Sequence, residues 1–464
     1  MTRRARGLLV CLCAIWATGL AWGADPEPSA TPAPASSPSP SPSASASPTP
    51  IPFDANVALD ADLQMDFRSE TLATFALANA GNGFRWLSTA HDAAENTRPG
   101  LTLFQIPVYD AVVRFAQGRV QEMDVSLYNR GDSGTLARDR FDALVQSCVK
   151  ALTDFTKIQP ADAGKNASEA VRTNAQVWQT DKARFLLESS SSRDPETGTY
   201  RAEFVRLTIT APEKPKSMME ESLASMGVST APKFAGASHV KTQPNGDVLI
   251  ADIPMVDQGD KGYCVVASAE RVLRYYGNKV DENELAQIAN SSAKKGTSST
   301  AMLDSLKVIS DKLHVKTRTL EEFDEQRFES MFDDYDRAAS RGQRAKPLDR
   351  KVKTFDELLA QINPDILLEV RTKNPSDMDR FFRTVQTQIN QGIPPLWSVM
   401  MGLFPKGTDP DEFGGHMRLI IGYNLKTNEV LFSDSWGYGH ELSRMPLPKA
   451  WTITTDLYSI EPLQ

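Results

Sequence analysis

Apolar side chains recur at helical spacing directly after Cys264. In the run from Val265 to Tyr276 they share one face of a helix: Val265, Val266, Ala269, Val272, Leu273 and Tyr276. Gly277 follows, and glycine commonly ends a helix. The pattern predicts a short buried helix with Cys264 in its first turn.

A second pattern lies in residues 414–437, GGHMRLIIGYNLKTNEVLFSDSWG. A β-rich apolar run follows His416, a polar turn spans Asn424 to Asn428, and another apolar run ends at Asp434. The midpoint between His416 and Asp434 is position 425, which falls inside the turn. Residues equidistant from a hairpin turn oppose each other, so the two side chains are predicted to form a cross-strand pair on one face.

The preceding part of the chain, residues 51–231, mixes both periodicities. VVRFAQGRVQEMDVSLY predicts a hairpin about Gln117 and Gly118, and a second hairpin is predicted about Asp194 to Gly198. Between them, FDALVQSCVKALTDF has helical spacing that places Cys148 on the packed face as a small hydrophobe. These patterns predict an α+β domain, and no cluster of catalytic or ligand residues reveals its role.

The N-terminus has the composition of targeting and linker segments. Residues 1–23 combine arginines, an apolar run and small residues before a cleavage point after Gly23, which predicts a signal peptide. Residues 24–50 are rich in Pro, Ser and Ala and predict a disordered linker. We therefore expect export to the periplasm or the extracellular space, with no stable membrane anchor after cleavage. An uncleaved anchor is the alternative.

Length and charge narrow the function classes. A chain of 464 residues predicts two folded units, the second from residue 239 to 464. The net charge of −8 becomes −11 when the segment with Arg3, Arg4, Arg6 and no acid is removed, which gives no general reason to bind nucleic acid. Only Cys148 and Cys264 then remain, so a disulfide framework is excluded, although one bridge between them stays possible.

Candidate chemistry gathers around Cys264. The positive end of a helix dipole favours a thiolate, the nucleophilic form of cysteine. Gln258 stands six residues earlier, and Gly259 and Gly262 free the backbone for a tight turn that brings its amide near the thiol as an oxyanion donor. Taken singly, each residue has a plain alternative, such as a buried structural cysteine or a solvated glutamine.

At these residues the sequence resembles the papain-like cysteine peptidases, and within them the branch related to bacteriocin-processing, double-glycine leader peptidases. The matching motifs are QGDKGYC, GGHMRLIIGY and SDSWG, and GTSSTAMLDSLKVI is similar to the leader-peptidase branch. The resemblance implies a papain-like fold, in which a helical part bearing the cysteine packs on an antiparallel sheet bearing the histidine and the acid. It also implies the roles of four residues: Cys264 as nucleophile, His416 as base and acid, Asp434 as orienting group and Gln258 as oxyanion donor. Trp436 would then shield the contact between His416 and Asp434.

The resemblance covers the second half of the chain as several short matching segments. A charged insertion from Thr319 to Asn390 departs from it, and helical spacing of Phe328, Met331, Phe332 and Tyr335 predicts that the insertion is partly folded. A lid or a docking surface is possible, but a solvated elaboration is the favoured interpretation.

The sequence as a whole therefore predicts an exported cysteine peptidase that acts on a peptide or protein through a thioester acyl-enzyme and needs no cofactor or metal. An acyltransferase or amidase would use the same residues. A catalytically silent binding protein would keep the fold without a reactive thiol.

Overall fold

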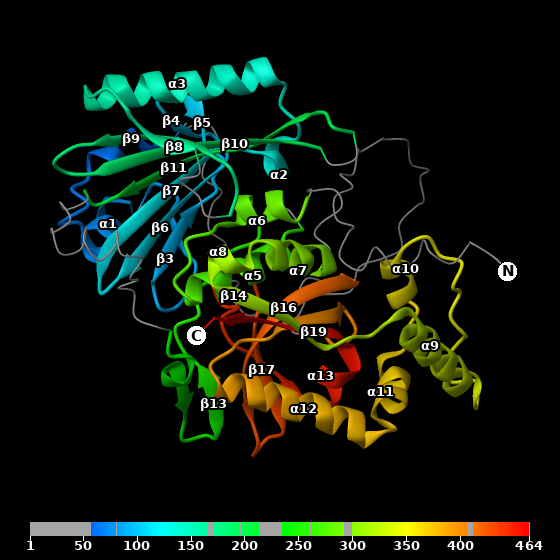
Figure 1. The fold of residues 1–464 in the computed structure, drawn as a ribbon. Coiled ribbons are helices and arrows are strands. Elements are labelled where there is room, and N and C mark those ends of the chain that lie inside the picture. The colour runs from blue at the N-terminus through cyan, green and yellow to red at the C-terminus, as the bar shows by residue number, and fades with distance from the viewer. Residues whose placement is uncertain are drawn as a thin grey trace, which may run out of the picture.

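The computed structural model describes residues 57–79, 81–165, 170–194, 197–212, 234–259, 262–291, 299–405 and 412–463. The predicted signal peptide and linker lie outside these ranges. The chain forms two large sheets of eight strands each, one in the first half (residues 57–212) and one in the second half (residues 234–463) (Figure 1). Helices and antiparallel sheets occur in both halves, so the predicted α+β class is confirmed.

The sheet of the first half has the strand order β2-β3-β6-β7-β11-β10-β9-β8. The predicted hairpin about Gln117 and Gly118 joins β6 to β7, and both turn residues have positive φ (53° and 72°), as a tight two-residue hairpin requires. The other predicted hairpin joins β10 to β11. The strand bounds are β2 (Arg85–Trp86), β3 (Ala93–Asn96), β6 (Asp110–Ala116), β7 (Arg119–Asn129), β8 (Ala161–Lys165), β9 (Asn174–Gln179), β10 (Arg184–Arg193) and β11 (Tyr200–Thr210).

Smaller elements complete the first half. A three-stranded sheet has the order β1-β4-β5. The remaining bounds are β1 (Val57–Ala58), η1 (Leu59–Gln64), α1 (Leu72–Ala78), β4 (Leu101–Leu103), β5 (Ile106–Pro107), α2 (Arg130–Ser133) and α3 (Arg138–Thr156).

The two faces of the first large sheet differ in character. Helix α3 covers one face (Figure 1), and Cys148 is buried there in an apolar core with Phe185 and Leu207. This confirms the predicted packing of Cys148. Residues on the other face are polar and ion-paired, among them Asp124 and Arg206, and this face lies toward the second half.

The sheet of the second half has the order β12-β13-β16-β15-β19-β14, with β17 paired to β16 and β18 paired to β17. Helix α5 packs on β16, and α12 also packs on β16. Its strands are β12 (Val240–Thr242), β13 (Asp247–Ile250), β14 (Val315–Glu321), β15 (Leu396–Met401), β16 (Gly414–Asn424), β17 (Glu429–Ser433), β18 (Ser443–Pro446) and β19 (Thr454–Pro462). Its helices are η2 (Gly236–His239), α5 (Cys264–Tyr275), α6 (Glu282–Ile288), α7 (Ser299–Val308), α8 (Ser310–Leu313), α9 (Glu325–Ser340), α10 (Phe355–Leu359), α11 (Pro364–Thr372), α12 (Pro375–Asn390) and α13 (Leu447–Ile453).

Helix α5 confirms the helix predicted after Cys264, and it is buried on every side. Besides its apolar face, the polar residues Ser268, Glu270 and Arg271 are also buried. The outer side of the helix contacts the first half, where Arg274 donates to Glu122 of β7 at 3.1 Å. The helix therefore lies between the two sheets.

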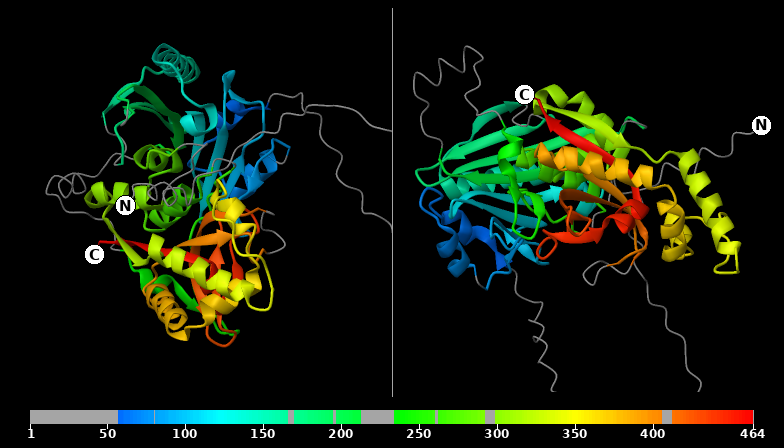
Figure 2. Two further views of the ribbon diagram at one scale, coloured as in Figure 1. Left: turned by 90° about the vertical axis from the view of Figure 1, so that its right-hand side faces the viewer. Right: turned by 90° about the horizontal axis from the view of Figure 1, so that it is seen from below.

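The interpretation of residues 319–390 as a solvated elaboration is wrong. Helices α9, α11 and α12 contribute Phe328, Tyr335, Ile366, Phe381 and Val385 to the largest apolar core of the second half. Figures 1 and 2 show α12 across the face of the second sheet that points away from the first half. The segment is highly charged because only one side of each helix is buried. The buried side of α12 covers a sheet face that would otherwise be exposed, and α11 packs on α9 and α13.

Candidate active site

Cys264 is the first residue of α5, as predicted, and Tyr263 precedes it as the N-cap without a side-chain cap. Cys264 is 6% exposed, and its neighbours are apolar residues of the core between α5 and the sheet. The first turn of a helix presents unpaired N–H groups and the positive end of the dipole, which stabilise a thiolate. The start of α5 thus favours the thiolate form of Cys264, whereas apolar neighbours favour the neutral thiol.

His416 and Asp434 meet, but in a register different from the predicted one. Asn424 pairs with Glu429 at the turn, and after a bulge at Ile421 the pairing continues from Ile420 with Phe432 to Leu419 with Ser433. Continued by one residue, this register places Arg418, not His416, opposite Asp434. The prediction centred the turn at residue 425, whereas the turn occupies residues 425–428.

The bulge decides which face these side chains share. Without it, Asp434 would oppose Leu419, and its carboxylate would lie on the face opposite to His416, because side chains alternate along a strand. One extra residue at Ile421 shifts the pairing by one position. His416, Arg418 and Asp434 consequently lie on the same face.

His416 is buried and bonded on both sides of its ring. Its Nε2 lies 2.6 Å from Asp434 Oδ1. The His416 side chain also forms a hydrogen bond with the Cys264 side chain. Burial alone would lower the pKa of His416, but the charge and hydrogen bond of Asp434, together with those of Cys264, outweigh it and raise the pKa to about 9. The imidazolium form is therefore favoured at neutral pH, beside an acidic partner on each side.

Asp434 is held by two further donors. Arg418 Nε donates to Asp434 Oδ2 at 2.7 Å, and the Ser435 backbone N–H donates to Oδ1 at 2.9 Å. Burial would raise the pKa of Asp434, but His416, Arg418 and Ser435 hold it at about 2. The carboxylate is thus ionised throughout the range in which His416 titrates.

Gln258 is buried next to the strand end that carries Asp434. Its backbone N–H donates to the Ser435 carbonyl at 2.8 Å, and its Oε1 accepts from the Ser435 hydroxyl at 2.7 Å. Gly259 and Gly262 have φ values of 57° and 64°, in the left-handed region that favours glycine. The two glycines thus adopt backbone conformations that other residues rarely adopt, and the approach of the Gln258 amide to Cys264 stays a prediction.

Trp436 lies against the histidine ring. The two rings stack with centroids 4.5 Å apart and planes inclined by 13°. The indole therefore covers one face of the imidazole, where it limits access of water to the contact with Asp434.

The site contains two arginines that the sequence pattern does not predict there, Arg418 and Arg271. Arg418 is 2% exposed, and only its spacing of two residues from His416 along one strand indicates that it shares a face with the histidine. Arg271 follows Cys264 by seven residues, two helical turns, and donates to the Asp434 carbonyl, the Ser433 hydroxyl and the Pro254 carbonyl at 2.9, 2.6 and 2.9 Å. It joins the helix of Cys264 to the strand end of Asp434.

Within the described ranges, no group of three or more histidine, cysteine, aspartate or glutamate side chains is suited to hold a metal ion. Nor does this part of the chain contain a helix long and apolar enough to cross a membrane.

Comparison with known proteins agrees with this geometry. Residues 250–458 match the model of a family described as the Peptidase_C39 like family, and the match assigns this part of the chain to the papain-like cysteine peptidase superfamily. The chain is thus a cysteine-type peptidase. Among solved structures it is similar to xylellain, a cysteine protease from Xylella fastidiosa, with 14% identity over 51% of this chain and 91% of that chain. The TM-score of 0.26 is too low for this likeness to support an argument. No curated protein matches the sequence.

Proposed function

We propose that the chain is an exported cysteine peptidase that cleaves peptide bonds through a thioester acyl-enzyme on Cys264. The observation that supports this most directly is the buried sequence of contacts from Cys264 to His416 and from His416 to Asp434. A thiol, a base and an orienting acid in this order are the components of nucleophilic catalysis at a carbonyl.

Each group would have one task in the reaction. The Cys264 thiolate attacks the carbonyl carbon of the peptide bond, and the carbonyl oxygen becomes an oxyanion. Ser435 holds the Oε1 end of the Gln258 amide, so the Nε2 end and the Cys264 backbone N–H serve as oxyanion donors. The C–N bond then breaks, the leaving amine takes the proton of the His416 imidazolium, and a thioester remains on Cys264.

Hydrolysis would return the enzyme to its first state. His416, now neutral, takes a proton from a water molecule as this water attacks the thioester carbonyl. The C–S bond breaks, the carboxylic acid leaves, and the thiolate and the imidazolium are restored. Asp434 stays ionised and keeps Nε2 protonated, which leaves Nδ1 to exchange the proton.

Export is supported by the composition of residues 1–23 and by the Pro-, Ser- and Ala-rich residues 24–50. Secretion of a tagged full-length chain, followed by N-terminal sequencing, tests it. A mature N-terminus near Ala24 in the periplasm or medium is expected. A chain retained in the cytoplasm with Met1 intact would contradict export.

The catalytic role of Cys264 predicts a difference in reactivity between the two cysteines. Burial raises the pKa of the Cys148 thiol to about 12, so this thiol is neutral and inaccessible at pH 7. Iodoacetamide should therefore modify Cys264 at least about 10-fold faster than Cys148 in the folded protein, because the thiolate is the reactive form. Peptide mapping by mass spectrometry measures both rates.

The control for this labelling is His416→Ala, which removes the partner that stabilises the thiolate and should slow modification of Cys264 alone. Equal, slow labelling of both cysteines would contradict the catalytic role and favour a binding protein. Product analysis with added hydroxylamine distinguishes a peptidase, which releases mainly the acid, from an acyltransferase, which releases mainly the hydroxamate.

A further inference from the structure

A cavity of about 710 Å³ lies between the two halves of the chain, next to the proposed catalytic site. Its walls come from strands of the first large sheet and from α5 and α6 of the second half. Asp257, Gly259 and Trp436 also line it. Because these residues flank Gln258 and cover His416, the cavity borders the proposed catalytic site.

The wall of the cavity carries more negative than positive groups. Among its lining residues, eight have carboxylates and four have guanidinium groups. Most of these side chains are partly or fully shielded from water, where charges are screened less than on the surface. The residues that line the cavity therefore carry more carboxylates than guanidinium groups.

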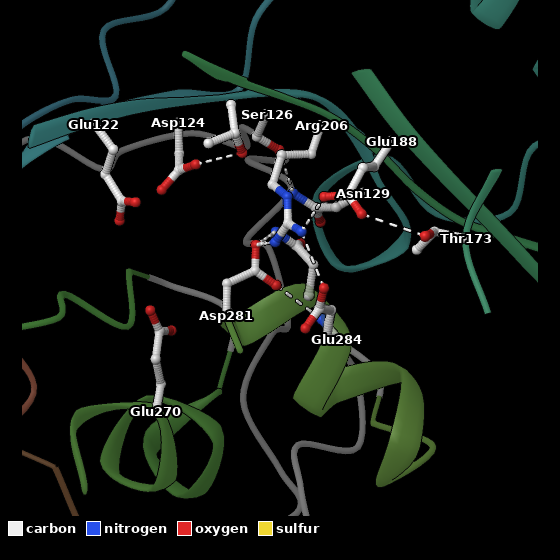
Figure 3. A network of polar contacts seen from close by, with 12 residues as sticks. Glu122, Asp124, Ser126, Asn129, Thr173, Glu188, Arg206, Glu270, Asp281 and Glu284 are labelled. Atoms are coloured by element: carbon white, nitrogen blue, oxygen red, sulfur yellow. Dashed lines mark hydrogen bonds and ion pairs between the residues drawn. The ribbon is translucent and has the colours of Figure 1, made fainter. Parts of the chain in front are cut away.

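Glu270 supplies a buried acceptor that is not used. The residue is 1% exposed, and its Oε1 accepts from Arg274 Nε at 2.6 Å, with Arg114 at 3.6 Å. Its Oε2 has no hydrogen-bond partner among the described residues. Figure 3 shows this carboxylate pointing from α5 toward β7, where Glu122 and Asp124 face it. Burial raises the pKa of Glu270, although Arg274 and Arg114 oppose this. A buried carboxyl oxygen without a partner is costly, which indicates that a ligand completes it.

Glu95 shows the same imbalance at another wall of the cavity. It is 7% exposed and pairs with Arg85 at 3.2 Å, but Arg85 is shared with Asp257. Burial and the neighbouring charge of Asp257 raise the pKa of Glu95 to about 7, even though Arg85 opposes this. An additional cation in the cavity would stabilise both carboxylates.

We infer that this cavity binds a cationic group of the peptide substrate, a guanidinium or an ammonium, with Glu270 Oε2 as a direct acceptor. The substrate assignment rests on the proposed function, because the cavity borders the loop of the oxyanion donor. The volume is ample for a lysine or arginine side chain or for a peptide N-terminus. The inference thus gives the peptidase a preference for substrates that carry positive charge near the cleaved bond.

The test uses octapeptides of alanine and serine that carry one arginine, moved along the chain, or citrulline at the same place. Citrulline has nearly the shape of arginine but no charge. Each peptide is prepared with a free and with an acetylated N-terminus, which separates a side-chain cation from the terminal ammonium. Cleavage is measured as kcat/KM, and binding to the Cys264→Ala protein is measured by calorimetry.

Arginine at one position is expected to raise kcat/KM over citrulline by about 10- to 100-fold, the range of a hydrogen bond to a charged group. Glu270→Gln should remove this preference and leave cleavage of the citrulline peptide within about twofold, because only the charged contact changes. Glu325→Gln, the same change at an exposed position on α9, should leave the preference intact. If acetylation lowers kcat/KM of the arginine and citrulline peptides alike, the terminal ammonium is the ligand.

Equal cleavage of arginine and citrulline peptides by wild type, with no loss of cleavage on N-terminal acetylation, would overturn the inference but not the proposed function. Charge-dependent binding to Cys264→Ala without any cleavage by wild type would overturn the proposed function and keep the cation site. If Glu270→Gln fails to fold in thermal denaturation, Glu270→Asp, which withdraws the carboxylate by one methylene group, tests the same contact, and an unchanged arginine preference in that folded variant would also overturn the inference.

Discussion

Arg418 changes what the carboxylate of Asp434 does for His416. One oxygen of Asp434 binds the histidine and the Ser435 N–H, and the other binds the guanidinium of Arg418. The three side chains are each at most 4% exposed, so the two cations share one anion in a buried site. An asparagine in place of Asp434 would keep an oxygen toward His416 but would turn its NH₂ group toward the N–H of Arg418.

This arrangement separates two effects of Asp434→Asn. The variant should lose about 3–5 kcal/mol of stability, because a buried arginine is left without its counterion. It should also move the alkaline limb of kcat/KM, expected near pH 9 from the pKa of His416, to lower pH, because the carboxylate no longer stabilises the imidazolium. Thermal unfolding and a pH–rate profile measure the two effects independently.

The double variant Arg418→Met with Asp434→Asn is the matched control. It removes both charges, so most of the stability lost in Asp434→Asn should return. The alkaline limb of kcat/KM should stay at the lower pH of that single variant. Asp434→Ala should be less active than Asp434→Asn because the ring also loses its orienting acceptor. A double variant with the wild-type pH profile would show that Asp434 does not set the pKa of His416.

A second prediction at the scale of one side chain concerns the effect of a Gln258 variant on kcat. Gln258→Glu keeps an oxygen for the Ser435 hydroxyl but replaces the amide donor with a second acceptor. The kcat should fall by about 10²–10³, the usual effect of losing one oxyanion donor, while KM changes little. The measurement is steady-state hydrolysis, with thermal unfolding as a check of the fold.

Ser435→Ala is the companion variant, because it loosens the amide without removing its donor. Its kcat should lie between those of wild type and Gln258→Glu. A kcat within twofold of wild type for Gln258→Glu would mean that backbone groups alone form the oxyanion site.

At the scale of elements, the hairpin of β16 and β17 shows how much of the candidate site can be predicted from the sequence. The apolar runs and the polar turn between Asn424 and Asn428 predict two strands with His416 and Asp434 near each other, and the contact exists. The bulge at Ile421 has no marker in this run of large apolar residues. Turn placement and a bulge set the register together, so the partner of Asp434 could not be predicted from symmetry about the turn alone.

For helices α9 to α12, the sequence predicts that the helices form but not what they pack against. Their spacing predicts that helices form, and α9 does bury Phe328, Met331, Phe332 and Tyr335. Helices α10 and α12 pack on β16, and α11 packs on α9 and α13. Both β16 and α13 follow the segment in sequence. Periodicity within one segment contains no information about such a partner, which is why the helices were interpreted as solvated.

At the scale of the whole molecule, the first half contacts the helix that carries the nucleophile. Arg206 of β11 pairs with Asp281 and Glu284 of the second half, and with Glu188 in its own sheet at 2.6 Å (Figure 3). Arg130 donates to the Ser291 carbonyl, and Arg274 of α5 donates to Glu122. These residues are far apart in sequence and belong to no periodic pattern, so the interface could not be predicted from either half.

Gly131 provides the sharpest test of this interface. It lies in α2 of the first half, and a methyl group on it would overlap the Tyr263 hydroxyl and come within 3.0 Å of Tyr263 Cζ. Tyr263 is 2% exposed and directly precedes Cys264, so it has little room to move without moving the start of α5. Gly131→Ala should therefore lower kcat/KM by about 10- to 100-fold, as displacement of a reacting group by about 1 Å does, although no catalytic residue is changed.

The measurements for Gly131→Ala are kcat/KM, the rate of Cys264 alkylation and thermal unfolding. Gly81→Ala is the matched control, because a methyl group there meets no atom within 4 Å and should have little effect. Adding Tyr263→Phe to Gly131→Ala removes the overlapping hydroxyl and should restore much of the activity, whereas a purely local destabilisation of α2 would not respond to this change. Equal activity of Gly131→Ala and Gly81→Ala would mean that the first half does not position the nucleophile. The contact of the first half with α5 would then only stabilise the fold and form the wall of the cavity.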